Sequence, residues 1–60
     1  MPSELEIRKA QRELLFDYLE IRRASKEKNP VLESKISRLR SGMSDEDKAI
    51  VEKEFAQIYG

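Results

Sequence analysis

The sequence predicts an all-α protein of three helices, because three helix-start signals and one helix stop divide its 60 residues. These signals are Ser3 with Glu6, Asn29 with Pro30, Ser44 with Asp47, and the stop at Gly42. The β-branched residues are scattered and never alternate over the length of a strand, so no sheet competes with this prediction. We find no internal repeat and no Gly/Ser linker, which indicates one small helical domain over residues 1–60.

The first helix is predicted over about residues 4–28. Ser3 followed by Glu6 forms a capping box, in which the hydroxyl accepts a backbone N–H of the first turn and Glu6 reaches back. We expect the helix to end near Lys28, because a proline disfavours the helical conformation of the residue before it, here Asn29.

The second helix is predicted over about residues 30–41. Asn29 is its cap and Pro30 suits its first position, where no backbone N–H is needed. At its end we expect Gly42 to adopt the left-handed conformation, with Met43 folded back on Leu39 as in a Schellman motif.

The third helix is predicted over about residues 45–58. Ser44 is its cap, and Asp45, Glu46 and Asp47 fill the first turn, where the helix dipole favours negative charge. The first helix should be roughly 38 Å long and the other two together about the same. The chain therefore forms either a helical hairpin with a broken second arm or a three-helix bundle.

The first helix carries apolar residues on two sides, so we expect it to contact two neighbours. One stripe is Ile7, Leu14, Tyr18 and Ile21, and the other is Leu5, Leu15, Phe16 and Leu19. One neighbour is the rest of the chain, and the other is predicted to be a second copy in a two-fold dimer, since a domain this small has a poor core. We assign self-association to Leu5, Leu15, Phe16 and Leu19. The simpler interpretation is that Phe16 and Leu5 are single exposed apolar residues, which are common on surfaces.

A basic middle segment is the second candidate site. Residues 21–42 hold seven bases and two acids, a net charge of +5, between flanks of −2 and −3. The seven bases are Arg22, Arg23, Lys26, Lys28, Lys35, Arg38 and Arg40. They could meet nucleic-acid phosphates or an acidic protein, or they could complement helix dipoles and the chain's own acids. A helix-turn-helix is disfavoured, because the helix that would enter the DNA groove starts with three carboxylates.

The composition excludes several kinds of chemistry. There is no Cys and no His, so a zinc or haem site built on those residues cannot form, and we expect no metal and no cofactor. No glycine-rich phosphate loop is present and the chain is too short to enclose a pocket, which argues against an enzyme and a small-molecule substrate. No apolar stretch approaches the ~20 residues that span a bilayer, and no secretory signal is evident. We therefore expect a cytoplasmic protein that does not enter the membrane.

Two functional hypotheses follow from the sequence. The first is a small non-enzymatic helical module for protein–protein interaction, regulatory or adaptor in role, which self-associates as a dimer and binds another protein. The alternative is a small nucleic-acid-binding regulator that uses the basic residues of segment 22–40.

Overall fold

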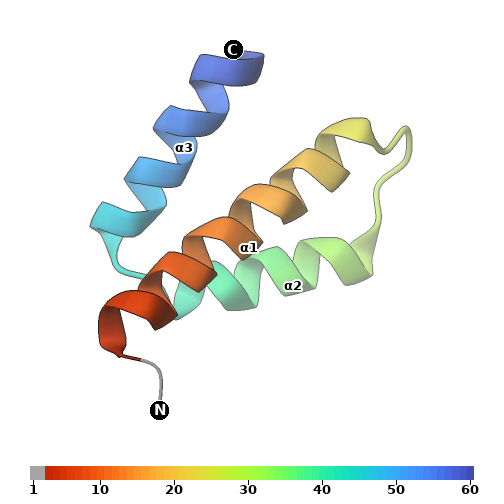
Figure 1. The fold of residues 1–60 in the computed structure, drawn as a ribbon. Coiled ribbons are helices and arrows are strands. Elements are labelled where there is room, and N and C mark those ends of the chain that lie inside the picture. The colour runs from red at the N-terminus through yellow and green to blue at the C-terminus, as the bar shows by residue number, and fades with distance from the viewer. Residues whose placement is uncertain (1–2) are drawn as a thin grey trace.

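The computed structural model describes residues 3–60, which form three helices in the order α1 (Glu4–Ala24), α2 (Pro30–Ser41) and α3 (Asp45–Tyr59). Helix α1 packs against both other helices, and in Figure 1 it lies between them, with α2 running back antiparallel to it. The prediction of an all-α fold with a long first helix packed against two shorter ones is confirmed.

All three predicted helix starts are capped as the sequence indicates. In each case a side-chain oxygen accepts a hydrogen bond from a backbone N–H of the first turn, which would otherwise have no partner within the helix. The hydroxyl of Ser3 accepts from Glu6 at 3.3 Å, Asn29 Oδ1 accepts from Val31 at 3.1 Å and from Leu32 at 3.2 Å, and the hydroxyl of Ser44 accepts from Asp47 at 3.2 Å.

The first helix ends earlier than predicted, at Ala24 instead of near Lys28. Ser25 has an extended backbone, with φ −78° and ψ 131°, while its hydroxyl donates to the carbonyl oxygen of Ile21 at 2.9 Å. Serine side chains offer the backbone such an alternative to a further helical turn. Residues 25–29 therefore form a connecting loop, which lets α2 turn back along α1.

The prediction of a left-handed Gly42 is wrong. Gly42 has φ −92° and ψ 2°, a conformation open to any residue. Helix α2 ends instead in a tighter turn with hydrogen bonds between residues three apart: the Gly42 N–H donates to the carbonyl of Leu39 and the Met43 N–H to that of Arg40, each at 3.1 Å. Met43 is buried in the core, so tertiary packing helps to hold a turn that needs no special backbone conformation at Gly42.

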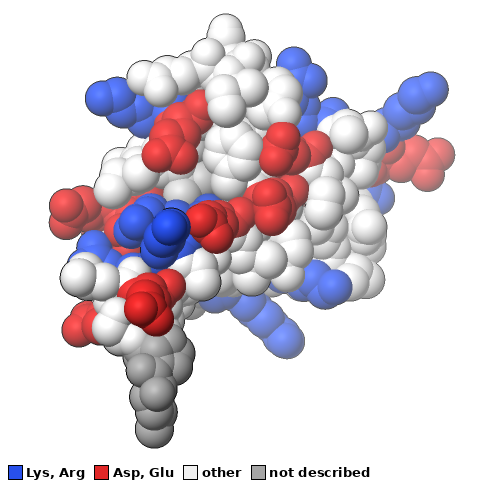
Figure 2. All heavy atoms as spheres, viewed as in Figure 1, with Lys and Arg blue, Asp and Glu red and all other residues white. Residues whose placement is uncertain are grey.

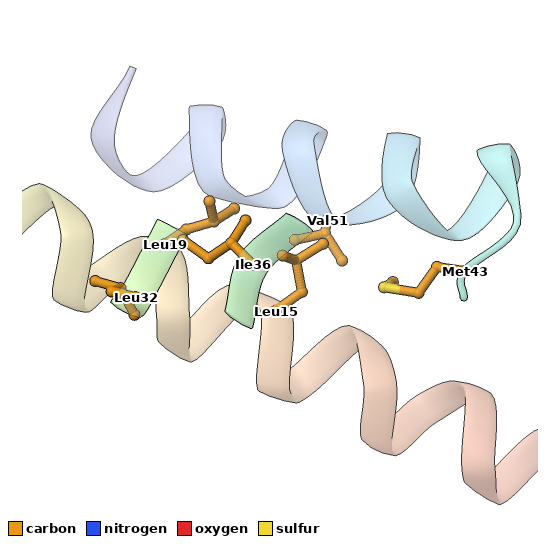
Figure 3. Packing of buried hydrophobic residues seen from close by; sticks show 6 residues of the cluster. All are labelled: Leu15, Leu19, Leu32, Ile36, Met43 and Val51. Carbon is orange, nitrogen blue, oxygen red and sulfur yellow. The ribbon is translucent and has the colours of Figure 1, made fainter. Parts of the chain in front are cut away.

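The core is small and receives side chains from all three helices and from the turn before α3. Its buried apolar members are Leu15, Leu19, Leu32, Ile36, Met43 and Val51. In Figure 3 the first two meet Ile36 and Val51 between the helices, with Leu32 and Met43 at opposite ends of the cluster. Phe16 and Phe55 pack beside it edge to face, with ring centroids 5.7 Å apart. This core fixes which side of α1 faces inward.

Candidate protein-interaction surface

The structure places the predicted self-association residues mainly inside the chain. Leu15 is 1% exposed and Leu19 is 5% exposed, and both belong to the core, while Phe16 packs against it. These three side chains are therefore occupied by intramolecular contacts in the fold described here. Leu5 is 73% exposed but stands apart from them near the start of α1.

The other apolar side of α1 is the one left uncovered. Ile7, Leu14 and Ile21 are 47%, 43% and 51% exposed. They are spaced seven residues apart, which is close to two helical turns, so they lie in a line almost parallel to the helix axis. We call these three residues the α1 stripe. Tyr18, which the sequence groups with them, turns partly inward and packs against the core.

Apolar residues scattered singly over a surface need no explanation, but three in one row along a helix form a surface suited to another helix. The row spans four helical turns, and the spacing between its members matches the repeat along which two helices pack side by side. The α1 stripe is therefore the candidate interaction surface. The sequence contained both apolar sides of α1, but the prediction assigned self-association to the side that the fold buries.

The seven basic residues do not form one free patch. Three of them are engaged within the chain: Arg22 with Glu33 at 3.5 Å, Arg40 with Glu52 at 3.0 Å, and Arg23 over the ring of Tyr59, 4.6 Å from its centroid. Four are exposed and make no ion pair with the residues that the structure describes, namely Lys26, Lys28, Lys35 and Arg38. The first two lie in the loop after α1 and the other two on α2. On the face shown in Figure 2, acidic and basic side chains run together across the middle of the molecule and other basic side chains project from separate edges.

A buried ion pair at the start of α3 is a feature that sequence reasoning missed. Asp47 is 1% exposed, and its two carboxylate oxygens accept from Arg8 Nε at 2.9 Å and Arg8 Nη2 at 3.1 Å. Arg12 Nη1 adds a third hydrogen bond at 3.0 Å. Hydrogen bonding to Arg8 lowers the pKa of Asp47 to about 2, against the opposing effect of its burial and with further help from Arg12 and Ser44.

This cluster positions helices and offers no obvious chemistry. A carboxylate held ionised by two guanidinium groups is a weak proton acceptor, so Asp47 is poorly suited to general-base catalysis. Its contacts instead fasten the first turn of α3 to the N-terminal half of α1. The sequence did contain an indication of this ion pair. Arg8 and Arg12 lie at helical spacing from Leu15 and Leu19, so they are on the side of α1 that faces the core.

A second group of contacts, centred on Tyr59, joins the C-terminal ends of α1 and α3. The hydroxyl of Tyr59 donates to Glu20 at 2.5 Å, which is the main cause of the raised pKa of Tyr59. The Tyr59 ring also packs against Phe55 at a tilt of 43°, with centroids 4.8 Å apart, and lies under Arg23. These contacts close α3 over one side of α1 and leave the α1 stripe uncovered.

The groove between α1 and α3 is open to solvent, with Phe16 and Ile58 among charged side chains. Among residues 3–60, no three His, Cys, Asp or Glu side chains gather in a way that could hold a metal ion. Within the same residues, none of the helices has the length and apolar character needed to cross a bilayer.

Comparison with known proteins gives no family for this chain: no family model matches it, and neither a curated protein nor a solved structure is detectably similar to it.

Proposed function

We propose that this protein is a small non-enzymatic interaction module that packs the α1 stripe against another helix and self-associates through it. The observation that supports this proposal is the row of half-exposed side chains Ile7, Leu14 and Ile21 on a helix whose opposite side forms the core. The contact surface is therefore rigid, since packing against α2 and α3 holds the helix that carries it.

The apolar area sets the strength that we expect. Burying a fully exposed leucine or isoleucine side chain gives about 1.5–3 kcal/mol, and the three side chains of the stripe are each about half exposed. One stripe should then contribute about 2–4 kcal/mol, and two facing stripes about twice that. Part of this gain offsets the loss of free motion on association, so we expect a weak complex with a dissociation constant in the high-micromolar to millimolar range.

Sedimentation equilibrium tests this proposal on the wild-type chain and on Leu14→Glu, which places a charge in the middle of the stripe. The concentration should run from about 1 μM to about 1 mM, the range in which weak complexes dissociate. We expect the wild-type mass to rise above the 7.0 kDa of one chain, and the variant to remain a monomer. Leu5→Glu is the matched control, because Leu5 is the more exposed leucine of the same helix and lies off the stripe.

Circular dichroism on the same samples shows whether each variant keeps its helices. A wild-type chain that sediments as a monomer over the whole range would overturn self-association. Equal weakening by Leu14→Glu and Leu5→Glu would show that the α1 stripe is not the contact surface.

The alternative, nucleic-acid binding through the basic segment 22–40, is less well supported. Arg22, Arg23 and Arg40 have intramolecular partners, and the four exposed bases are divided between a loop and α2. Phosphate contacts release counterions and weaken steeply with salt, whereas an apolar helix contact does not. The salt dependence of binding therefore separates the two functions.

A further inference from the structure

We propose that the partner of the α1 stripe is a second copy of this chain, whose α1 runs antiparallel and is related by a two-fold axis next to Leu14. This inference depends on the proposed self-association and adds the orientation of the second copy and the residues that meet across the contact. It follows from the spacing of the stripe and from the charges beside it.

The α1 stripe is symmetrical about Leu14, with an isoleucine at the same distance on either side. Ile7 precedes Leu14 by seven residues and Ile21 follows it by seven, so the two ends are about 10.5 Å from the middle. A two-fold contact requires that if residue i meets residue j, then j of the same chain meets i of the partner. Turning a second copy end to end places Leu14 against Leu14 and Ile7 against Ile21 of the second copy, which gives three apolar layers.

The charges at the two ends of α1 favour the antiparallel arrangement. The first turn carries Glu4 and Glu6, and the last turn carries Arg22 and Arg23. Glu4 and Arg22 are 18 residues apart, which is five complete turns, so both lie along the same edge of the stripe. An antiparallel pair brings Glu4 beside Arg22 of the second copy, and this contact occurs twice. A parallel pair would instead place the two acidic first turns next to each other, and likewise the two basic last turns.

Arg22 is able to make this additional contact. Its side chain is 45% exposed, and its contact with Glu33 is long, 3.5 Å from a single guanidinium nitrogen. A guanidinium group has five N–H donors, so donors remain for Glu4 of the second copy. The helix dipoles of the two α1 helices also oppose each other in this orientation, which favours it.

The other edge of the stripe is compatible with this orientation. Asp17 lies three residues after Leu14, and Ala10 lies four residues before it on the same edge. In the antiparallel pair Asp17 approaches Ala10 of the second copy.

Disulfide trapping tests the orientation, since the natural chain has no Cys and single-cysteine variants are unambiguous. Ile7→Cys and Ile21→Cys are prepared separately, one of them labelled with ¹⁵N, then mixed and oxidised mildly above the dissociation constant. Two cysteines cross-link only when their Cα atoms are within about 4.4–6.8 Å. We expect the labelled–unlabelled product to exceed either homodisulfide by far more than the roughly twofold excess that random pairing gives. Leu5→Cys mixed with Ile21→Cys is the matched control, which should show no such excess.

The outcomes separate this inference from the proposed function. An excess of the two homodisulfides, or the ratio of about 1:2:1 that random pairing gives, would overturn the antiparallel pair while the self-association of the wild type could still stand. A wild type without concentration-dependent mass, together with no specific cross-link, would overturn both.

A charge exchange gives an independent readout. Glu4→Arg and Arg22→Glu should each weaken the dimer by several-fold, and the double variant should restore it, because each change turns two attractive contacts into repulsive ones. If the double variant is as weak as the single ones, these two residues do not face each other.

Discussion

Replacing two adjacent leucines by alanine should separate the stability of the fold from its self-association. Leu15 is 1% exposed, and removing such a side chain from a packed core costs about 2.7–5 kcal/mol, including the cavity that is left. A domain of this length is stable by only about 3–9 kcal/mol. Leu15→Ala should therefore lose a large part of the free energy of unfolding.

Leu14→Ala should cost much less. Somewhat more than half of this side chain is buried, so the lost transfer free energy is about 1–1.5 kcal/mol, with no enclosed cavity to add to it. Both variants change leucine to alanine in the middle of α1, so their helix propensities change equally. The difference between them measures which side of α1 faces inward.

Thermal and urea denaturation followed by circular dichroism, at a few μM and so well below the expected dissociation constant, gives this difference without a contribution from the dimer. In a domain of this size 1 kcal/mol shifts the Tm by about 4–8 °C, so Leu15→Ala should lower it by at least about 10 °C and Leu14→Ala by about half of that or less. In sedimentation the order should reverse, with Leu14→Ala weakening the dimer. Equal losses of stability, or the larger loss for Leu14→Ala, would refute the assignment of the two faces and with it the α1 stripe.

Three further changes test the turn, the buried ion pair and the basic segment. The pKa of Asp47 falls from 3.8 to about 2 on folding, so the ionised carboxylate stabilises the fold fully above pH 3.8, and this stabilisation is lost as the pH falls towards 2. In Asp47→Asn, the free energy of unfolding should no longer decrease over that pH range because of this group, which acid unfolding followed by circular dichroism would measure. Gly42→Ala should leave the Tm unchanged or raise it by a few degrees, since the φ of Gly42 suits alanine and the added Cβ meets only a carbonyl oxygen at 3.7 Å; a clear decrease would contradict the turn described here. The double variant Lys35→Glu, Arg38→Glu should leave helicity and dimer mass unchanged. If the wild type instead binds duplex DNA with a steep salt dependence and this variant abolishes the binding, the alternative function is favoured; each lost phosphate contact should lower the slope of log affinity against log salt concentration by about 0.9.

The helix starts could be predicted from the sequence because capping is local. A side-chain oxygen at Ser3, Asn29 or Ser44 reaches a backbone N–H only two or three residues away, so no knowledge of the rest of the fold is needed. The helix ends were less predictable. The turn at Gly42 is held with the help of the burial of Met43, and this depends on where α3 packs.

The inward face of α1 could not be chosen from periodicity alone, because both sides of the helix carry apolar residues at helical spacing. The choice depends on contacts with residues far along the chain. Arg8 is paired with a residue 39 positions away, and this pair helps to turn the side with Leu15 towards α3. A buried carboxylate is also hard to expect, since Asp47 stands beside two exposed acids in the first turn of the same helix.

The uncovered stripe is a consequence of where the two shorter helices pack on α1. Helix α1 has 21 residues, while α2 has 12 and α3 has 15, and both of the shorter helices pack on the side of α1 that carries the core. Helices pack with their axes 8–10 Å apart, and two helices at this distance from a third cover about half of its circumference. The remaining half would be polar in a chain selected to remain a monomer, because half-exposed apolar side chains gain nothing there. Isoleucine and leucine at the same point of three successive heptads instead suit packing against a further helix, and none of the three helices in residues 3–60 occupies that place.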